Sequence, residues 1–208
     1  MEKYTTLYDV LIIGAGPSGS NAAISYKNLN PNLKVGLIDK SIFPRDKSCG
    51  DAIGPGVISA LKRFNNQHIL DNEPQVVSTT LYGPENIGIQ NYIPEVKNKE
   101  DSIVYVIPRI DLDNRILNLA KDLDVDVFEG YSFVSFEKDS DNKLVVEIKN
   151  GDNITKLGAK ILVGADGANS RVRKQLNVNT NSDWHKAIAI RAYICLLYTS
   201  PSPRDKHR

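Results

Sequence analysis

Three glycines form the pattern G-x-G-x-x-G at Gly14, Gly16 and Gly19, which could bind the pyrophosphate of a dinucleotide. Gly14 would permit a tight turn, Gly16 would let a pyrophosphate approach the backbone, and Gly19 would let a helix pack close to a strand. Pro17 suits the first turn of that helix, where its missing N–H costs little, and Ser18 follows it. Because a helix start offers free N–H groups and a partial positive charge to phosphates, these residues predict a dinucleotide site.

The elements around the glycines are those that such a site needs. Residues 8–13 (YDVLII) predict a buried strand, residues 20–25 a closely packed helix, and residues 34–38 a second strand that ends at Asp39. Asp39 lies twenty residues after Gly19, where a carboxylate accepts hydrogen bonds from an adenosine ribose. Strand, helix and acid together favour this site over a glycine turn that only joins a strand to a helix.

A second candidate site follows the apolar strand predicted at residues 160–163. That strand runs into GADG at residues 164–167, which puts the carboxylate of Asp166 at a strand tip, where it can bind a sugar or polyol hydroxyl. Gly167 would let a ligand approach the backbone. The alternative is a helix cap, in which Asp166 or Asn169 accepts hydrogen bonds from free N–H groups. The motif alone favours the cap, and its pairing with the first motif favours the ligand.

Arg109 begins a helix predicted over residues 109–123. A cation at that position opposes the helix dipole, so we expect an anionic partner for it. The partner could be a bound ligand or, alternatively, Asp111 or Asp113 of the same helix.

Cys49 lies in the polar, basic segment of residues 40–51, hereafter the 40–51 loop. The nearby cations Arg45 and Lys47 favour a reactive thiolate, and Gly50 would let the loop approach a flat ring closely. The alternative is a small buried hydrophobic side chain, the commonest fate of a free cysteine.

The composition is that of an ordinary globular protein, with 41% hydrophobic and 25% charged residues among 208. A formal net charge of +1 gives no sign of a nucleic-acid partner. We expect no metal site, no membrane span and no signal peptide, and therefore a cytoplasmic protein.

The last fourteen residues, 195–208, are treated as non-native. They begin CLLYTSPSPRD, which resembles a translated sequencing-library adaptor, so we expect the native chain to break off near Ile194. Leaving them out removes three basic residues and one acidic residue, which changes the formal net charge from +1 to −1. Cys49 then remains as the only native cysteine, which fits a reducing compartment.

Strand-like residues between 75 and 107 interrupt the alternation of strands and helices. They suggest an excursion into a second sheet, to which residues 183–194 would also contribute. Residues 143–149 and 153–157 flank Asn150 and Gly151, a strong hairpin signal.

Four segments resemble the geranylgeranyl reductase family of flavoproteins, which has the para-hydroxybenzoate-hydroxylase-like fold. They are DVLIIGAGPSGSNAA, FPRDKSCGD, IPRIDLDNRIL and GADGANSRVRKQL. The resemblance implies an α/β fold: a Rossmann-like, glutathione-reductase-like FAD-binding domain of three layers with part of a β-sheet substrate domain. Residues 1–194 would be an incomplete FAD-binding domain, with substrate-domain strands near 75–107 and 183–194. Many relatives have a second glycine where this chain has Asp51, which leaves the subfamily open.

The resemblance also implies which residues meet FAD. The glycines would hold the pyrophosphate, Asp39 the adenosine ribose, the Phe133 backbone the adenine and Asp166 the ribityl chain, while Arg109 would face the phosphates. Cys49 and Gly50 would lie beside the isoalloxazine ring, with Cys49 as the catalytic candidate. The full set of predicted cofactor residues is Gly14, Gly16, Pro17, Ser18, Gly19, Asp39, Lys40, Cys49, Gly50, Arg109, Phe133, Asp166 and Gly167.

The function implied is FAD-dependent reduction of isolated C=C bonds in polyprenyl chains of lipids, chlorophyll precursors or quinones. NAD(P)H or another reductant would supply electrons, and a lipid substrate could bring the protein to a membrane surface. One alternative is a flavin-dependent monooxygenase or halogenase of the same fold; another is a nucleotide-binding protein without catalysis. Because the family's last FAD motif and substrate tunnel would lie beyond Ile194, we expect the chain as given to be inactive.

Overall fold

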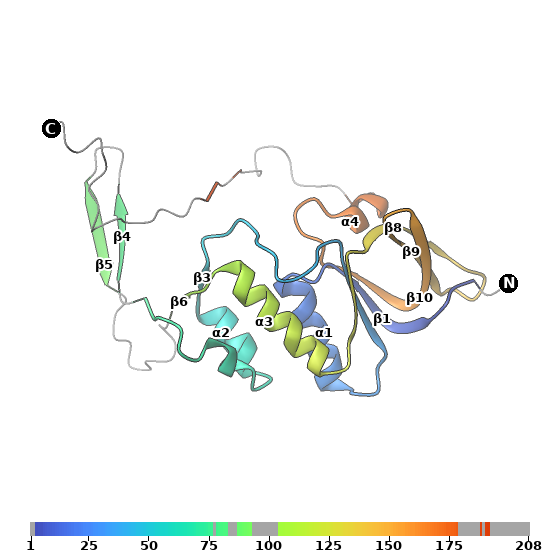
Figure 1. Ribbon diagram of the computed structural model, residues 1–208, viewed down its shortest axis with the longest axis horizontal. Helices are drawn as coiled ribbons and strands as arrows, with labels where there is room; N and C mark the ends of the chain where they lie inside the picture. The colour runs from blue at the N-terminus through green and yellow to red at the C-terminus, as the bar shows by residue number, and fades with distance from the viewer. Residues whose placement is uncertain are drawn as a thin grey trace.

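The computed structural model describes residues 3–76, 78–82, 87–92, 104–178, 188, 190 and 191, and its main element is a six-stranded sheet (Figure 1). The strand order is β7-β2-β1-β10-β9-β8. The strands are β1 (Leu7–Ile13), β2 (Val35–Asp39), β7 (Asp126–Glu129), β8 (Ser132–Lys138), β9 (Leu144–Asn150) and β10 (Asn153–Gly164). Strands β7, β2, β1 and β10 run parallel, whereas β9 is antiparallel to both β10 and β8.

Strand β1 lies near the middle of this sheet and is buried on both faces. Val10 and Ile12 belong to the apolar cluster on one face, and Leu11 and Ile13 to the cluster on the other. A nearly continuous apolar run such as YDVLII is what a central parallel strand requires, because both its faces are covered.

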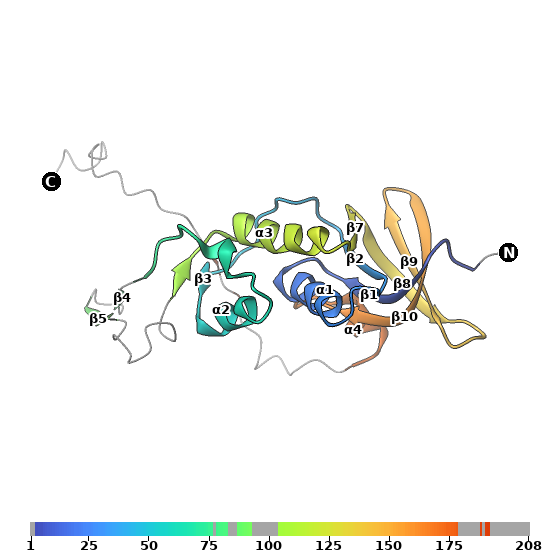
Figure 2. The same ribbon diagram turned by 90° about the horizontal axis from the view of Figure 1, so that it is seen from below.

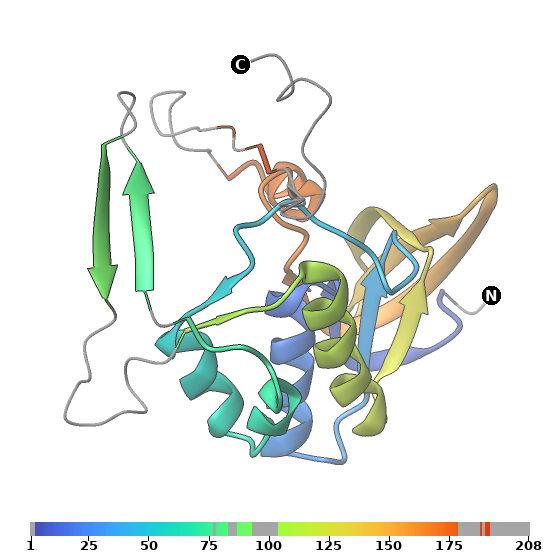
Figure 3. The same cartoon turned by 60° about the vertical axis from the view of Figure 1, so that its left-hand side comes forward.

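Helices cover one face of the parallel strands. On the other face, the antiparallel strands β8 and β9 of the same sheet contribute side chains to the second apolar cluster. Helix α1 (Pro17–Leu29) packs beside α3 (Arg109–Asp122), as Figures 2 and 3 show, with α2 (Pro55–Lys62) and the 3-10 turn η1 (Gln67–Leu70) in the same apolar cluster. On the opposite face, side chains of β8 and β9 and of the short α4 (Arg171–Gln175) pack against β1 and β2. The predicted three-layer α/β fold is confirmed.

Strand β10 corrects one sequence-based expectation. Residues 153–157 and 160–163 were expected as two strands, but they form one strand of 12 residues. It pairs with β9 as far as Ala159 and with β1 from Gly158 onward, so it joins the antiparallel and parallel parts of the sheet. Gly158 does not end a strand: a Cβ there would lie 2.7 Å from the Tyr4 ring, so the glycine makes room for that contact.

The hairpin predicted at Asn150 and Gly151 is confirmed. Strands β9 and β10 pair with Asn150 opposite Asn153, and Gly151 has a φ of +56°. A positive φ at the turn is the conformation that glycine adopts without steric cost.

Two small sheets lie outside the main one. Strands β4 (Ser78–Tyr82) and β5 (Gly88–Tyr92) form an antiparallel hairpin that stands apart from the main sheet (Figures 1 and 3). Strands β3 (Ala52–Ile53) and β6 (Tyr105–Val106) bring the end of the 40–51 loop to the start of α3. Assignment of these strands to a substrate domain stays a prediction.

Other expectations fall where the structure describes little or nothing. Within 183–194 only residues 188, 190 and 191 are described, and 195–208 lie outside the described residues. None of the helices in the described ranges has the length and apolar character needed to cross a membrane.

Candidate functional site

A cavity of about 490 Å³ lies at the edge of the sheet where the parallel strands end. Gly14 follows β1, Asp39 ends β2 and Asp166 follows β10, and all three line this cavity. Carboxyl ends of parallel strands meet at one edge, where open α/β sheets bind their ligands. The sheet topology therefore joins the two motifs, which lie about 150 residues apart in the sequence, into one site.

Most of the predicted cofactor residues line this cavity. They are Gly14, Gly16, Pro17, Ser18, Asp39, Lys40, Arg109, Phe133, Asp166 and Gly167. Gly19, Cys49 and Gly50 are not among its lining residues.

The three glycines of the first motif differ in how much space the surrounding chain leaves for a side chain. Gly14 has a φ of +103°, and a Cβ there would lie 2.4 Å from the Ala165 carbonyl oxygen. A Cβ on Gly19 would lie 1.7 Å from the carbonyl oxygen of Gly14. A Cβ on Gly16 would meet only the Arg45 Nη2 atom, at an ordinary 3.5 Å. The fold therefore requires Gly14 and Gly19, whereas Gly16 leaves room on the cavity side.

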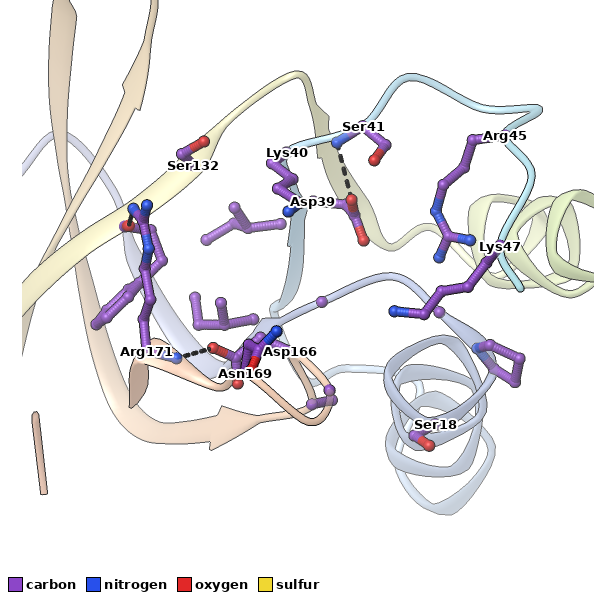
Figure 4. Close-up of a pocket in the computed structure, with 18 of the residues that line it drawn as sticks. Ser18, Asp39, Lys40, Ser41, Arg45, Lys47, Ser132, Asp166, Asn169 and Arg171 are labelled. Carbon is purple, nitrogen blue, oxygen red and sulfur yellow. Dashed lines mark hydrogen bonds between the residues drawn. The ribbon is translucent and has the colours of Figure 1, made fainter. Parts of the chain in front are cut away.

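Asp39 is held in place at the tip of β2. Its Oδ1 accepts a hydrogen bond from the Ser41 N–H at 2.8 Å (Figure 4). Its Oδ2 accepts one from the Ala15 N–H, also at 2.8 Å. A carboxylate has about four lone-pair positions, so it can still accept hydrogen bonds from a ligand. This geometry suits the predicted contact with ribose hydroxyls.

Asp166 caps the helix that follows it, as the alternative interpretation expected. Its carboxylate accepts a hydrogen bond from the Arg171 N–H at 2.6 Å (Figure 4). It accepts another from the Ser170 hydroxyl. Ser170 in turn accepts from the Arg173 N–H at 3.0 Å, so two side chains cap α4. Asp166 also lines the cavity, and its contact with a ribityl chain stays a prediction.

We expect Asp166→Ala to lower the stability of the ligand-free protein by about 1 kcal/mol, the usual worth of a helix cap. If Asp166 also binds a ligand hydroxyl, ligand affinity should fall by a further 1.5–3 kcal/mol or so. Urea unfolding with and without ligand measures both effects. Asp139→Ala is the matched control, because it removes a carboxylate that accepts hydrogen bonds from the Asp141 and Lys143 N–H groups and does not line the cavity. Equal effects of the two changes on ligand affinity would leave Asp166 as a cap alone.

Arg109 has the anionic partner that its position required, and this partner is Asp113. The guanidinium donates from Nε to Oδ1 at 2.5 Å and from Nη2 to Oδ2 at 2.8 Å. These bonds to Asp113 raise the pKa of Arg109 above its usual value. Burial of the guanidinium acts in the opposite direction but is the smaller effect. Arg109 nevertheless lines the cavity, so the predicted contact with phosphates stays a prediction.

Cys49 is half-buried and lies beside Arg109 rather than in the cavity wall. The Cys49 side chain contributes to the raised pKa of Arg109, though less than Asp113 does. Gly50 is exposed, and a Cβ on it would have no neighbour within 4 Å. The expectation that this part of the loop lies against a flat ring stays a prediction.

Three cavity-lining cations were not among the predicted site residues: Arg45, Lys47 and Arg171. Figure 4 shows Lys47 pointing into the cavity from the 40–51 loop, and Arg171 donates to the Phe133 carbonyl oxygen at 3.1 Å. Two of them, Arg45 and Lys47, could have been predicted as site residues from the basic character of the 40–51 loop. Among the described residues, five cationic side chains line the cavity against three carboxylates, which favours an anionic ligand.

Asp51 ends the 40–51 loop in a backbone conformation that suits glycine. Its φ is +59°, a conformation that glycine adopts more readily than other residues. Its buried carboxylate accepts two hydrogen bonds from Arg191 Nη1, at 3.0 and 3.1 Å, and Arg191 also pairs with Asp46. The aspartate thus tolerates the backbone conformation and joins the 40–51 loop to Arg191.

Residues 7–192 match the family model of an FAD binding domain. The chain belongs to this FAD-binding family. The menaquinone reductase of Mycolicibacterium smegmatis is 30% identical over 190 residues, which cover 91% of this chain and 44% of that protein. The geranylgeranyl diphosphate reductase of Rhodobacter capsulatus is 30% identical over 172 residues, 81% of this chain and 40% of that protein. The chain thus spans less than half the length of these relatives.

The fold also occurs among oxygenases. The crystal structure of p-nitrophenol 4-monooxygenase PnpA from Pseudomonas putida superposes with a TM-score of 0.72 at 18% identity, over 82% of this chain and 44% of that one. At this level of identity the likeness concerns the fold alone.

The residues of the cavity fit FAD. The volume of the cavity lies within the range of roughly 300–1,000 Å³ that is usual for ligand pockets. Gly16 leaves room for a pyrophosphate at the start of α1, and the surplus of cations complements its charge. Asp39, across the Gly14 turn, can accept hydrogen bonds from a ribose.

Proposed function

We propose that the complete protein is an FAD-dependent reductase of isolated C=C bonds in polyprenyl chains, such as those of lipids, chlorophyll precursors or quinones. The observation that carries the proposal is the family match together with relatives named as menaquinone and geranylgeranyl diphosphate reductases. An isolated double bond is not polarised, and bound reduced FAD supplies the hydride that no side chain can. NAD(P)H or another reductant would renew the electrons.

The cavity lining supports the following set of proposed binding roles. The N–H groups at the start of α1, beside Gly16, would bind the pyrophosphate. Asp39 would accept hydrogen bonds from the ribose, and Asp166 would do the same for the ribityl chain. The cavity wall at Phe133 would meet the adenine. Arg45 and Lys47, which also line the cavity, would add charge complementarity for the phosphates.

Cys49 would supply the proton that completes the reduction. Addition of a hydride to one carbon of a C=C bond requires a proton on the other, and the Sγ–H group can donate it. Solvent would then return a proton to the sulfur. The proposal thus assigns the proton donor to a side chain beside Arg109, which lines the cavity.

Cys49→Ala should leave FAD bound and slow double-bond reduction by about 100-fold, the lower range for loss of a general acid. The measurement is a single anaerobic turnover of the FAD-loaded complete protein, with the flavin reduced beforehand and a geranylgeranyl lipid added. Ser48→Ala, an exposed neighbour in the same loop, is the control and should keep the wild-type rate. An unchanged rate in Cys49→Ala would remove Cys49 from the chemistry.

The same single-turnover experiment tests the proposed function. Geranylgeranyl lipids, which carry no quinone ring, should reoxidise the flavin, whereas the corresponding saturated lipids should not. Failure of every unsaturated prenyl chain to reoxidise the reduced flavin would contradict the proposal. A lipid substrate would also bring the protein to a membrane surface.

A further inference from the structure

A buried carboxylate on α3 holds two arginines that line the FAD cavity. Asp113 is 0% exposed, and its Oδ2 accepts hydrogen bonds from Arg45 Nη1 at 2.9 Å and from Arg109 Nη2 at 2.8 Å. Its Oδ1 accepts from Arg109 Nε at 2.5 Å. Two positive charges therefore share one buried negative charge, and the group as a whole keeps a charge of +1.

That remaining positive charge faces the cavity. Arg45 and Arg109 both line it, whereas Asp113 does not. Apart from atoms of the neighbouring residues in the chain, Arg45 Nη2 is also the atom nearest to the position of a Cβ on Gly16, at 3.5 Å. One guanidinium thus reaches Asp113 with Nη1 and the glycine turn with Nη2, which is where a pyrophosphate would lie.

Arg45 needs such support because of where it lies. It belongs to the 40–51 loop, which carries no helix or strand until β3, and an arginine stem has many rotamers. The centroid of the Phe43 ring lies 4.7 Å from the Cζ atom of Arg45, so the ring packs against one side of the guanidinium. The carboxylate of Asp113 fixes the plane of the guanidinium through a charge-assisted hydrogen bond. A group fixed before the ligand arrives loses less freedom on binding.

We propose that Asp113 is a positioning residue for the cofactor: it holds Arg45, with Arg109 beside it, so that the guanidinium binds the pyrophosphate of FAD over Gly16. The inference rests on the proposed function, since it requires FAD in this cavity. Asp113 itself touches no ligand and acts through the two arginines.

A purely structural role predicts a different outcome. In that case Asp113 would only tie the 40–51 loop to α3, and its loss would weaken every ligand of the cavity alike. Ligands with and without a pyrophosphate separate the two roles: FAD and ADP carry one, and adenosine does not.

The test is Asp113→Asn, which keeps the shape of the side chain and removes its charge. We expect the dissociation constants of FAD and ADP to rise about 10-fold or more, with that of adenosine unchanged. Asp111→Asn, an exposed residue two positions earlier on α3, is the control and should bind all three like the wild type. In an Arg45→Gln background, the effect of Asp113→Asn on ADP should shrink, because the pair acts as a unit.

The proposal is overturned if Asp113→Asn binds ADP like the control, or if it weakens adenosine as much as ADP. Should Asp113→Asn fail to fold, Arg45→Lys decides, because lysine keeps the charge but cannot bridge Asp113 and a pyrophosphate. Wild-type affinity of Arg45→Lys for ADP would then overturn it. A wild-type protein that binds no FAD would instead contradict the proposed function.

Discussion

Gly19→Ala is expected to destabilise the ligand-free protein by about 3 kcal/mol or more, the upper range for overpacking. The new Cβ would lie 1.7 Å from the Gly14 carbonyl oxygen, which is a backbone atom and cannot rotate away. Helix α1 would have to move off β1, at the centre of the sheet. Since a domain has only about 5–15 kcal/mol of stability, much of the protein should unfold at moderate temperature. Urea unfolding followed by circular dichroism measures this loss.

Gly56→Ala is the matched control for that experiment. Gly56 lies in α2, and a Cβ on it would have no neighbour within 4 Å. Alanine in this helix should be neutral or stabilising by up to about 1 kcal/mol. If Gly19→Ala unfolded at the same urea concentration as Gly56→Ala, the close packing of α1 on the glycine turn would be wrong.

Gly16→Ala should have the opposite profile: normal stability without ligand and an affinity for FAD lower by about 100-fold, equivalent to roughly 2.7 kcal/mol. Gly16 has a φ of −66°, which alanine adopts freely, and the new Cβ would meet only Arg45 Nη2 at 3.5 Å. The methyl group would instead occupy the space left for the pyrophosphate. Thermal unfolding of the FAD-free protein and titration with FAD give the two values.

Two outcomes would contradict this assignment. Wild-type affinity for FAD in Gly16→Ala would mean that the pyrophosphate does not lie over Gly16. A loss of ligand-free stability as large as that of Gly19→Ala would mean that the fold itself requires the glycine.

The sequence predicts the glycine turn well because its determinants are local. Gly14 needs a positive φ, and Gly19 needs the absence of a side chain, and both requirements come from neighbours in one strand–turn–helix unit. Asp39 and Asp166 were identified for a related reason: each lies at the tip of a parallel strand, and such tips share one edge of a sheet.

The remainder of the site depends on contacts that no local pattern encodes. Asp113 was considered only as a partner of Arg109, since the path of the 40–51 loop brings Arg45 to it from 68 residues away. Arg191 reaches Asp51 across 140 residues. The role of Gly158 depends on Tyr4, which packs against it from the start of the chain. Such pairings follow from sheet topology, which periodicity alone does not fix.

Product analysis tests the central claim most directly. The complete FAD-loaded protein is supplied with a reductant and a geranylgeranyl lipid in the presence of air, and the lipid is analysed by mass spectrometry. A reductase predicts a product that has gained two hydrogen atoms per reduced bond and no oxygen. A product that has gained an oxygen atom would identify a monooxygenase and contradict the proposed function.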